Sequence, residues 1–252
     1  MKYALVNGTR QEAQPKLRGA CPNCEREAVA KCGQQRIWHW SHLGKLECDH
    51  WWEPETEWHR SWKALFPEEW QEVVHVADDG ERHIADVKTG AGLVVELQHS
   101  PIAPEERFSR ESFYKSMAWI VDGTRYKRDL TAFREAVAHG SIINDNPLYI
   151  NPLTSGAGIF RRWAPLQCAV FVDFGNEEFS IAGFALPKAV LWLFQLDRTT
   201  GRVVVGAVTR ESFVQFCLTG SELQRLVVTR AQQPRVRYQL PQGRRYPLRR
   251  RF

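Results

Sequence analysis

Cysteine and histidine residues near the N-terminus have the spacing of metal ligands. Cys21 and Cys24 form a Cys-x2-Cys pair, whose two thiolates can bind one Zn²⁺ ion tetrahedrally. Two more ligands are needed, and the set that we favour is Cys21, Cys24, His42 and Cys48. His39 in place of Cys48 is the close alternative, and Cys32 is a further candidate. With four protein ligands the zinc would be structural, holding together a segment too short to bury much core. Buried free cysteines are the plain alternative.

Acidic residues in the middle of the chain form a second group that can do chemistry. Asp86 lies near the end of one expected strand and Glu96 on the next, so the hairpin between them can bring the two carboxylates together. Gln98 shares a face with Glu96, and Glu57 on the preceding helix can reach the same place. Such acids repel one another unless a divalent cation lies between them. Mg²⁺ or Mn²⁺ at Asp86 and Glu96 would suit phosphodiester hydrolysis.

Glu96 stands in an otherwise apolar run, residues 93–98. A carboxylate in such surroundings is costly unless it is paired or bound to a metal. A structural ion pair with Lys63 or Arg110 is therefore the main rival to metal binding.

The periodicity of apolar residues indicates the elements that must position these side chains. Apolar residues at helical spacing predict a helix at 53–66, in which Pro54 would occupy the first turn. Around it we expect strands at 72–76, 83–87, 93–98 and 117–122, and helices at about 104–117 and 129–137. The expected order is helix, three strands, helix, strand.

The ends of the chain differ from this middle part. Short strands at 3–6, 28–31 and 36–40 would surround the zinc site. Residues 145–158 are rich in Pro, Asn and Gly, which predicts a linker or long loop. After it we expect strands at 168–174, 190–196 and 202–208 and a helix at 210–218. We therefore expect a zinc-binding module at 1–52, an α/β core at 53–144 and a β-rich C-terminal region at 145–252.

Charge is distributed unevenly along the 252 residues, whose formal net charge is +5. Residues 225–252 contain nine arginines and no acid, among them Arg244, Arg245, Arg249 and Arg250. Such a basic end suits contact with a phosphate backbone, and a solubilising tail is the plain alternative. Neither a secretory signal nor an apolar run long enough to span a bilayer is present, so we expect a cytoplasmic protein without a membrane partner.

Several of these motifs together resemble the competence protein CoiA-like family, which is assigned to the PD-(D/E)XK nuclease superfamily. The matching segments cover about half of the chain and are residues 21–24, 39–42, 55–63, 83–87, 95–102, 110–114 and 119–123. The resemblance implies a restriction-endonuclease-like core with the order α-β-β-β-α-β. It also implies Glu57, Asp86 and Glu96 as metal-binding acids.

The resemblance carries two further implications for site residues. Gln98 occupies the position at which many relatives have a lysine, and Lys63 or Lys88 would have to supply the missing positive charge. Arg110 and Tyr114, four residues apart, resemble a pair that would face the DNA end or backbone, and His59 would contact a phosphate or pack.

The function expected from the sequence is therefore metal-dependent cleavage of DNA. Asp86 and Glu96 would bind the metal, Glu57 would complete its shell and Gln98 would orient the attacking water. Two alternatives stay open: a DNA-binding adaptor on a nuclease fold that lacks activity, and a protein-interaction platform. The missing motif lysine favours the adaptor.

Overall fold

A computed structural model describes residues 1–44, 48–154, 157–181, 184–197 and 199–227. The arginines predicted to contact DNA at positions 244, 245, 249 and 250 lie outside the described residues. Among the described residues, no helix is long and apolar enough to cross a membrane.

The N-terminal module is a small antiparallel sheet of five strands in the order β2-β1-β3-β4-β5. The strands are β1 (Tyr3–Val6), β2 (Thr9–Glu12), β3 (Arg18–Ala20), β4 (Glu27–Lys31) and β5 (His39–His42). The strands predicted at 3–6 and 28–31 are confirmed, whereas the one predicted at 36–40 begins only at His39. The hydrophobic core of the N-terminal module contains few side chains, among them Ala4, Ala28 and Trp40. So little buried apolar surface leaves a small module dependent on other stabilisation.

A second, nine-stranded sheet forms the body of the molecule, in the order β10-β11-β16-β15-β12-β9-β8-β7-β6. Its strands are β6 (Gln71–Val76), β7 (Arg82–Lys88), β8 (Val94–Gln98), β9 (Met117–Asp122), β10 (Ser141–Asp145), β11 (Leu148–Asn151), β12 (Ala169–Asp173), β15 (Val190–Leu196) and β16 (Val203–Thr209). Strand β9 pairs in parallel with both β8 and β12, and the other pairs of neighbouring strands described in this sheet are antiparallel. The strands β13 (Ser180–Ile181) and β14 (Phe184–Ala185) form a separate hairpin.

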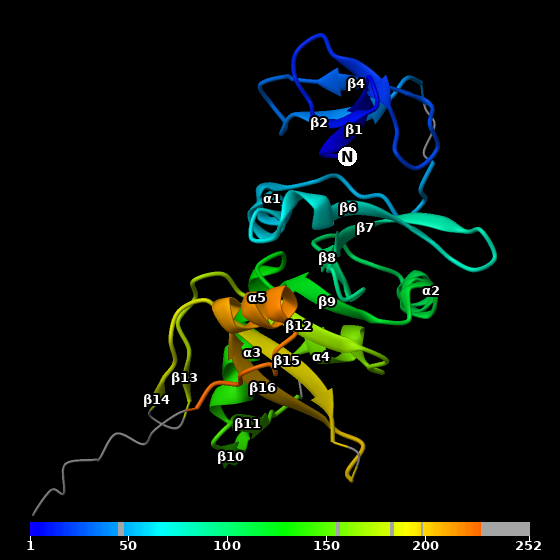
Figure 1. Cartoon of the computed structure of the whole chain (residues 1–252). Helices are drawn as coiled ribbons and strands as arrows, with labels where there is room; N and C mark the ends of the chain where they lie inside the picture. Colours follow the sequence, from blue (N-terminus) through cyan, green and yellow to red (C-terminus); the bar gives the residue numbers. More distant parts are fainter. Residues whose placement is uncertain (45–47, 155–156, 182–183, 198, 228–252) are drawn as a thin grey trace, which may run out of the picture.

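Five α-helices occur in the described residues, together with a short 3-10 turn at Glu68–Trp70. They are α1 (Glu57–Lys63), α2 (Pro104–Tyr114), α3 (Lys127–Ala138), α4 (Gly158–Trp163) and α5 (Arg210–Thr219). From α1 to β9 the elements follow one another as helix, three strands, helix, strand, as the sequence predicted. The structure is thus a mixed α/β fold with a small β module at its N-terminus (Figure 1).

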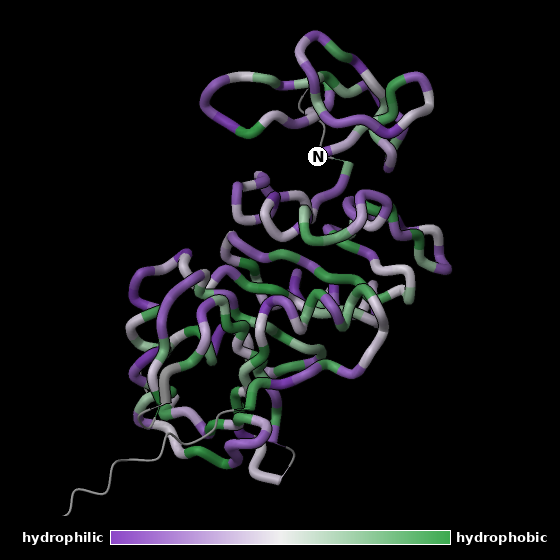
Figure 2. Tube along the Cα trace, turned by 60° about the vertical axis from the view of Figure 1, so that its left-hand side comes forward, coloured by the Kyte–Doolittle hydropathy of each residue, from purple (hydrophilic) through white to green (hydrophobic). Residues whose placement is uncertain are grey.

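Alternate side chains of the central strand β9 serve two hydrophobic cores. Trp119 packs into a core with Phe133 of α3, and Ile120 packs into another core with Trp62 of α1 and Phe213 of α5. Because successive side chains of a strand point to opposite faces, helices cover the sheet on both sides. Figure 2 shows the resulting apolar stretches along the large sheet, beside a mostly hydrophilic N-terminal module. Each fully buried large side chain contributes about 1.5–3 kcal/mol.

The sequence predicted a linker or long loop at residues 145–158, but strand β11 lies inside this stretch. Because β11 pairs with β16, this part of the stretch belongs to the large sheet. The sheet also continues across the expected boundary at residue 144, because β9 pairs with β12 over five residues. Pro, Asn and Gly at the ends of short strands gave the segment the composition of a loop.

Candidate active site and metal centre

Cys21, Cys24, His42 and Cys48 lie together at one end of the N-terminal sheet, with one ligand atom from each within 4.8 Å of the others. The Sγ atoms of Cys21 and Cys48 are 3.7 Å apart, and Cys24 Sγ is 3.3 Å from His42 Nε2. The edge of a tetrahedron of thiolates around Zn²⁺ is about 3.8 Å for a Zn–S bond of about 2.3 Å. The favoured set of ligands is therefore confirmed as a group able to hold a metal such as zinc.

The alternative ligand, His39, lies outside this group. Its Nδ1 atom is 2.8 Å from the carbonyl oxygen of Ile37. Within the cluster, burial and the Cys21 thiol raise the pKa of Cys48 to about 12. Cys48 is therefore a thiol at neutral pH unless a cation replaces its proton, as a metal ligand requires.

The residues that follow Cys48 fasten the metal centre to the large sheet. Asp49 accepts hydrogen bonds from the backbone N–H of Ile84 at 2.9 Å and pairs with His83 Nδ1 at 2.8 Å. The ring of Trp51 stacks on His83, with ring centroids 3.3 Å apart. Both partners belong to β7, the strand that carries Asp86. Asp49, which directly follows the candidate ligand Cys48, thus links strand β7 to the N-terminal module.

The predicted acids Asp86 and Glu96 meet where strands β7 and β8 part. Regular pairing ends at Val87 and Val95, and the next residues in that register are the two acids. The carboxylates then take over the backbone donors, because Asp86 N–H donates to Glu96 Oε1 at 3.2 Å and Leu97 N–H donates to Asp86 Oδ2 at 3.0 Å. The structure therefore brings the two acids together as the sequence predicted.

Lys63 of α1 reaches the same place and is almost completely buried. Its Nζ atom lies 2.9 Å from Asp86, 3.0 Å from Glu72 and 3.2 Å from Glu55. Burial disfavours the charged amine, but the three carboxylates raise the pKa of Lys63 well above its usual value. A permanent positive charge therefore stands beside Asp86, supplied by the helix and not by Gln98.

Glu96 has a different counter-charge, the guanidinium of Arg110, at 3.0 Å. Burial and the neighbouring Asp86 raise the pKa of Glu96 to about 8, and Arg110 opposes this shift. Arg110 also donates to the carbonyl oxygen of Trp51 at 2.7 Å. Tyr114 is buried next to Trp51. Arg110 and Tyr114 are both buried and both line the cavity of the two acids, so the expectation that they face DNA stays a prediction.

Glu53 is a functional candidate that the sequence did not reveal. Its carboxylate receives N–H donors from His99 and Ser100 and lies 2.9 Å from His59 Nε2. Burial opposes its ionisation, but His59 and Ser100 lower the pKa of Glu53 to about 2. Gln98 contacts this group, with its Nε2 atom 3.5 Å from Glu53 and 2.8 Å from the Ser100 carbonyl. The side chain of Gln98 thus contacts Glu53 and the Ser100 carbonyl rather than Asp86.

The start of helix α1 explains why Glu57 does not join the acids. The helix was expected from residue 53, but Thr56 caps it and the turn begins at Glu57. Residues 53–56 are therefore outside the helix, which leaves Glu53 and Glu55 lining the cavity. Glu57 is exposed and lines a neighbouring pocket instead. A threonine three residues before His59 was the signal for this later start.

The acids and Lys63 line a cavity of about 70 Å³, together with His59, Arg110 and Tyr114. This is room for a small ion with a few waters, since one water needs about 10–15 Å³. In the described part of the chain, the groups of three or more metal-ligating atoms within 4.8 Å are the cysteine cluster and Asp49–His50–His83. Asp86 and Glu96 belong to neither group.

Comparisons of the chain with protein-family models, with curated proteins and with solved structures found no match. The resemblance to the CoiA-like family therefore stays a prediction that depends on the motifs quoted above.

Proposed function

We propose that this protein is a metal-dependent deoxyribonuclease with a site of the PD-(D/E)XK type. The observation that carries the proposal is the meeting of Asp86 and Glu96 at the divergence of two strands, with the ammonium of Lys63 2.9 Å from Asp86. Two acids and one lysine in a small cavity form a set of groups that suits phosphodiester hydrolysis. The helix-strand order around them is consistent with a restriction-endonuclease-like core.

The chain's own residues would divide the work. Asp86 and Glu96 would hold Mg²⁺ or Mn²⁺, which would supply a more acidic water and neutralise charge on the scissile phosphate. The raised pKa of Glu96, which comes from burial and then from the neighbouring Asp86, supports this assignment, because a cation between the two acids would favour their ionised forms. Lys63 would stabilise negative charge that develops on the phosphate, which is the role that Gln98 cannot fill. The arginine-rich end at 225–252 would hold the DNA backbone.

A second candidate is a DNA-binding adaptor without nuclease activity. The observation that favours it is the existing neutralisation of both acids, Asp86 by Lys63 and Glu96 by Arg110. Such pairs stabilise the carboxylates without a metal. The two candidates therefore differ in whether a divalent cation enters between the acids.

Cleavage assays separate the two candidates. Linear, circular and single-stranded DNA would be incubated with Mg²⁺ or Mn²⁺ and the wild-type chain, Asp86→Asn or Glu96→Gln. We expect metal-dependent cleavage that both substitutions reduce by at least about 100-fold, on the scale of removing a single group that stabilises the transition state. Glu69→Gln, at an exposed acid outside the cavity, is the matched control. Salt-sensitive binding without cleavage of any substrate would establish the adaptor instead.

A further inference from the structure

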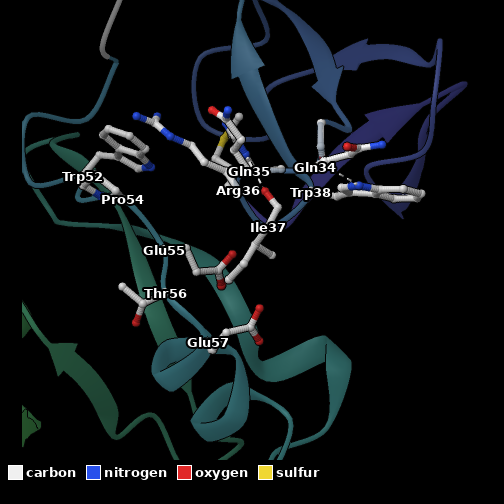
Figure 3. A pocket seen from close by; sticks show the side chains of 13 residues that line it. Gln34, Gln35, Arg36, Ile37, Trp38, Trp52, Pro54, Glu55, Thr56 and Glu57 are labelled. Carbon is white, nitrogen blue, oxygen red and sulfur yellow. Dashed lines mark hydrogen bonds between the residues drawn. The ribbon is translucent and has the colours of Figure 1, made fainter.

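A large pocket opens beside the candidate active site, between the N-terminal module and the segment that leads into α1. Its volume is about 810 Å³, within the range of ligand-binding pockets. Figure 3 shows Trp38 and Trp52 on opposite sides of this pocket, with Arg36 and Ile37 between them. The pocket shares Met1, Trp52 and Glu55 with the lining of the acid cavity, so a ligand in it would adjoin the cavity that Asp86 lines.

The two tryptophans are unusual because each is 47% exposed. A large indole on the surface costs free energy unless a partner covers it, and two at one pocket indicate a binding site for flat groups. The Trp38 ring is held in place, because its Nε1–H donates to the Gly33 carbonyl at 3.2 Å. Arg60 further fixes this loop by donating to the Trp38 carbonyl at 2.8 Å. The ring of Trp38 is thus held in position without a ligand.

The remaining lining suits nucleobases better than a purely apolar group. Gln34, Gln35 and Thr56 offer amide and hydroxyl groups that can hydrogen-bond with base edges. Arg36 supplies a positive charge for a phosphate. Two acids also line the pocket. Glu55 is neutralised within the protein, since Arg60 and Lys63 lie 2.6 and 3.2 Å from it, whereas Glu57 is exposed to solvent.

We propose that this pocket binds unpaired nucleobases and that the substrate of the adjacent acid site is single-stranded DNA. The inference depends on the proposed nuclease function for the nature of its ligand. Bases in a duplex have both faces stacked on their neighbours, whereas unpaired bases present a free face to an indole. A single strand held by Trp38 and Trp52 passes its backbone to the cavity of Asp86 and Glu96.

Binding measured without divalent metal tests the inference independently of cleavage. The probes are a fluorescein-labelled 12-mer of thymidylate, an abasic 12-mer with the same phosphates and a 12-base-pair duplex, each titrated with the full chain by fluorescence anisotropy. The arginine-rich end can bind the phosphates of both the first and the second probe, and the tryptophan variants separate any stacking of arginine on bases from stacking on the indoles. We expect the thymidylate strand to bind at least about 10-fold more tightly than the abasic strand, as stacking of bases would give.

Variants assign the effect to the two indoles. Trp38→Ala and Trp52→Ala are each expected to weaken thymidylate binding by about 5- to 100-fold and to leave abasic binding unchanged. Leu196→Ala, which removes an apolar side chain that is also 47% exposed but lies on β15, is the matched control. Circular dichroism and zinc content check that each variant folds.

Three results would overturn the inference: equal binding of thymidylate and abasic strands by the wild-type chain, alanine substitutions that weaken duplex binding as much as thymidylate binding, or alanine variants that bind like the wild type. The first comparison needs no variant, so misfolding cannot obscure it. Base-dependent binding without any metal-dependent cleavage would refute the nuclease and leave the pocket's assignment intact. Metal-dependent cleavage without base-dependent binding would refute the pocket's assignment and leave the nuclease proposal intact.

Discussion

The Nζ atom of Lys63 lies 2.9 Å from Oδ1 of Asp86, so the positive charge at the candidate site comes from helix α1. Gln98, two residues after Glu96, is a neutral amide, and the sequence offered Lys63 or Lys88 as the source of a positive charge instead. Lys63 is surrounded by carboxylates of the segment before α1 and of β6 and β7. Lys63 is therefore the lysine that pairs with Asp86.

Removing the Lys63 charge is expected to destabilise the fold strongly. Lys63→Met would leave Glu55, Glu72 and Asp86 around an apolar group, and breaking a buried ion pair costs about 3–5 kcal/mol. Urea unfolding at pH 7 measures the loss. Lys115→Met is the control, because Lys115 is exposed and its contact with Asp78 is 3.8 Å. Equal unfolding midpoints for the two variants would contradict the buried network.

Zinc analysis of the purified chain is expected to give one ion per molecule. Cys48→Ser and His42→Ala should lose it, because each removes one of the four ligands. Cys32→Ser and His39→Ala should retain it, since neither residue belongs to the cluster. Elemental analysis after dialysis provides the measurement. Loss of zinc from His39→Ala, with retention in His42→Ala, would show that the ligand set is wrong.

The stabilising effect of Glu53 is expected to depend on pH. Its pKa in the folded chain is about 2, against an ordinary value of 4.5. A group whose pKa is depressed by folding stabilises above its unfolded pKa, and this contribution is lost as the pH falls through the folded value. Glu53→Gln should therefore cost about 3 kcal/mol at pH 7, and the difference from wild type should shrink between pH 4.5 and pH 2.

Denaturant unfolding of the wild type and Glu53→Gln at pH 7, 4 and 3 measures this difference. A gap that stayed constant over this range would show that ionisation of Glu53 is not what stabilises the fold. A gap that widened towards low pH would reverse the sign of the argument.

A chain that ends at residue 144 is not expected to fold. It would retain α1 to β9 but lose β12, the parallel neighbour of β9. It would also lose Asp173, a fully buried acid that accepts hydrogen bonds from the indoles of Trp58 and Trp62 at 3.0 and 2.8 Å. Circular dichroism and a thermal scan check this. A cooperative transition for the shortened chain would restore residue 144 as a domain boundary.

Local patterns in the sequence were enough for the order of elements from α1 to β9 and for the four residues that could hold a metal such as zinc. Strong alternation and turn residues marked β6, β7 and β8, and the Cys-x2-Cys pair limited the choice of ligands near it. Asp86 and Glu96 were found because a hairpin of that length fixes which residues face each other. In each case the decisive information lay within a few tens of residues.

Contacts between distant segments could not be predicted in the same way. The burial of Arg110 depends on Glu96 and on the Trp51 carbonyl, which no local pattern links. Pro54 suits the first turn of a helix, so the sequence placed Glu53 inside helix α1, which in fact begins at Glu57. The joining of β9 with β12 depends on parallel pairing across a long connection, which leaves no signature in either strand.

The pairing of β9 with β12 also has a consequence during synthesis, because β9 must wait for β12 before the sheet can form around it. All six residues of β9 are buried in the finished sheet, and one edge of the strand stays uncovered until Ala169–Asp173 has emerged. At about 5–20 residues per second, the ribosome needs roughly 2 to 10 s to reach β12 after β9. During that interval an apolar strand edge is open to neighbouring nascent chains.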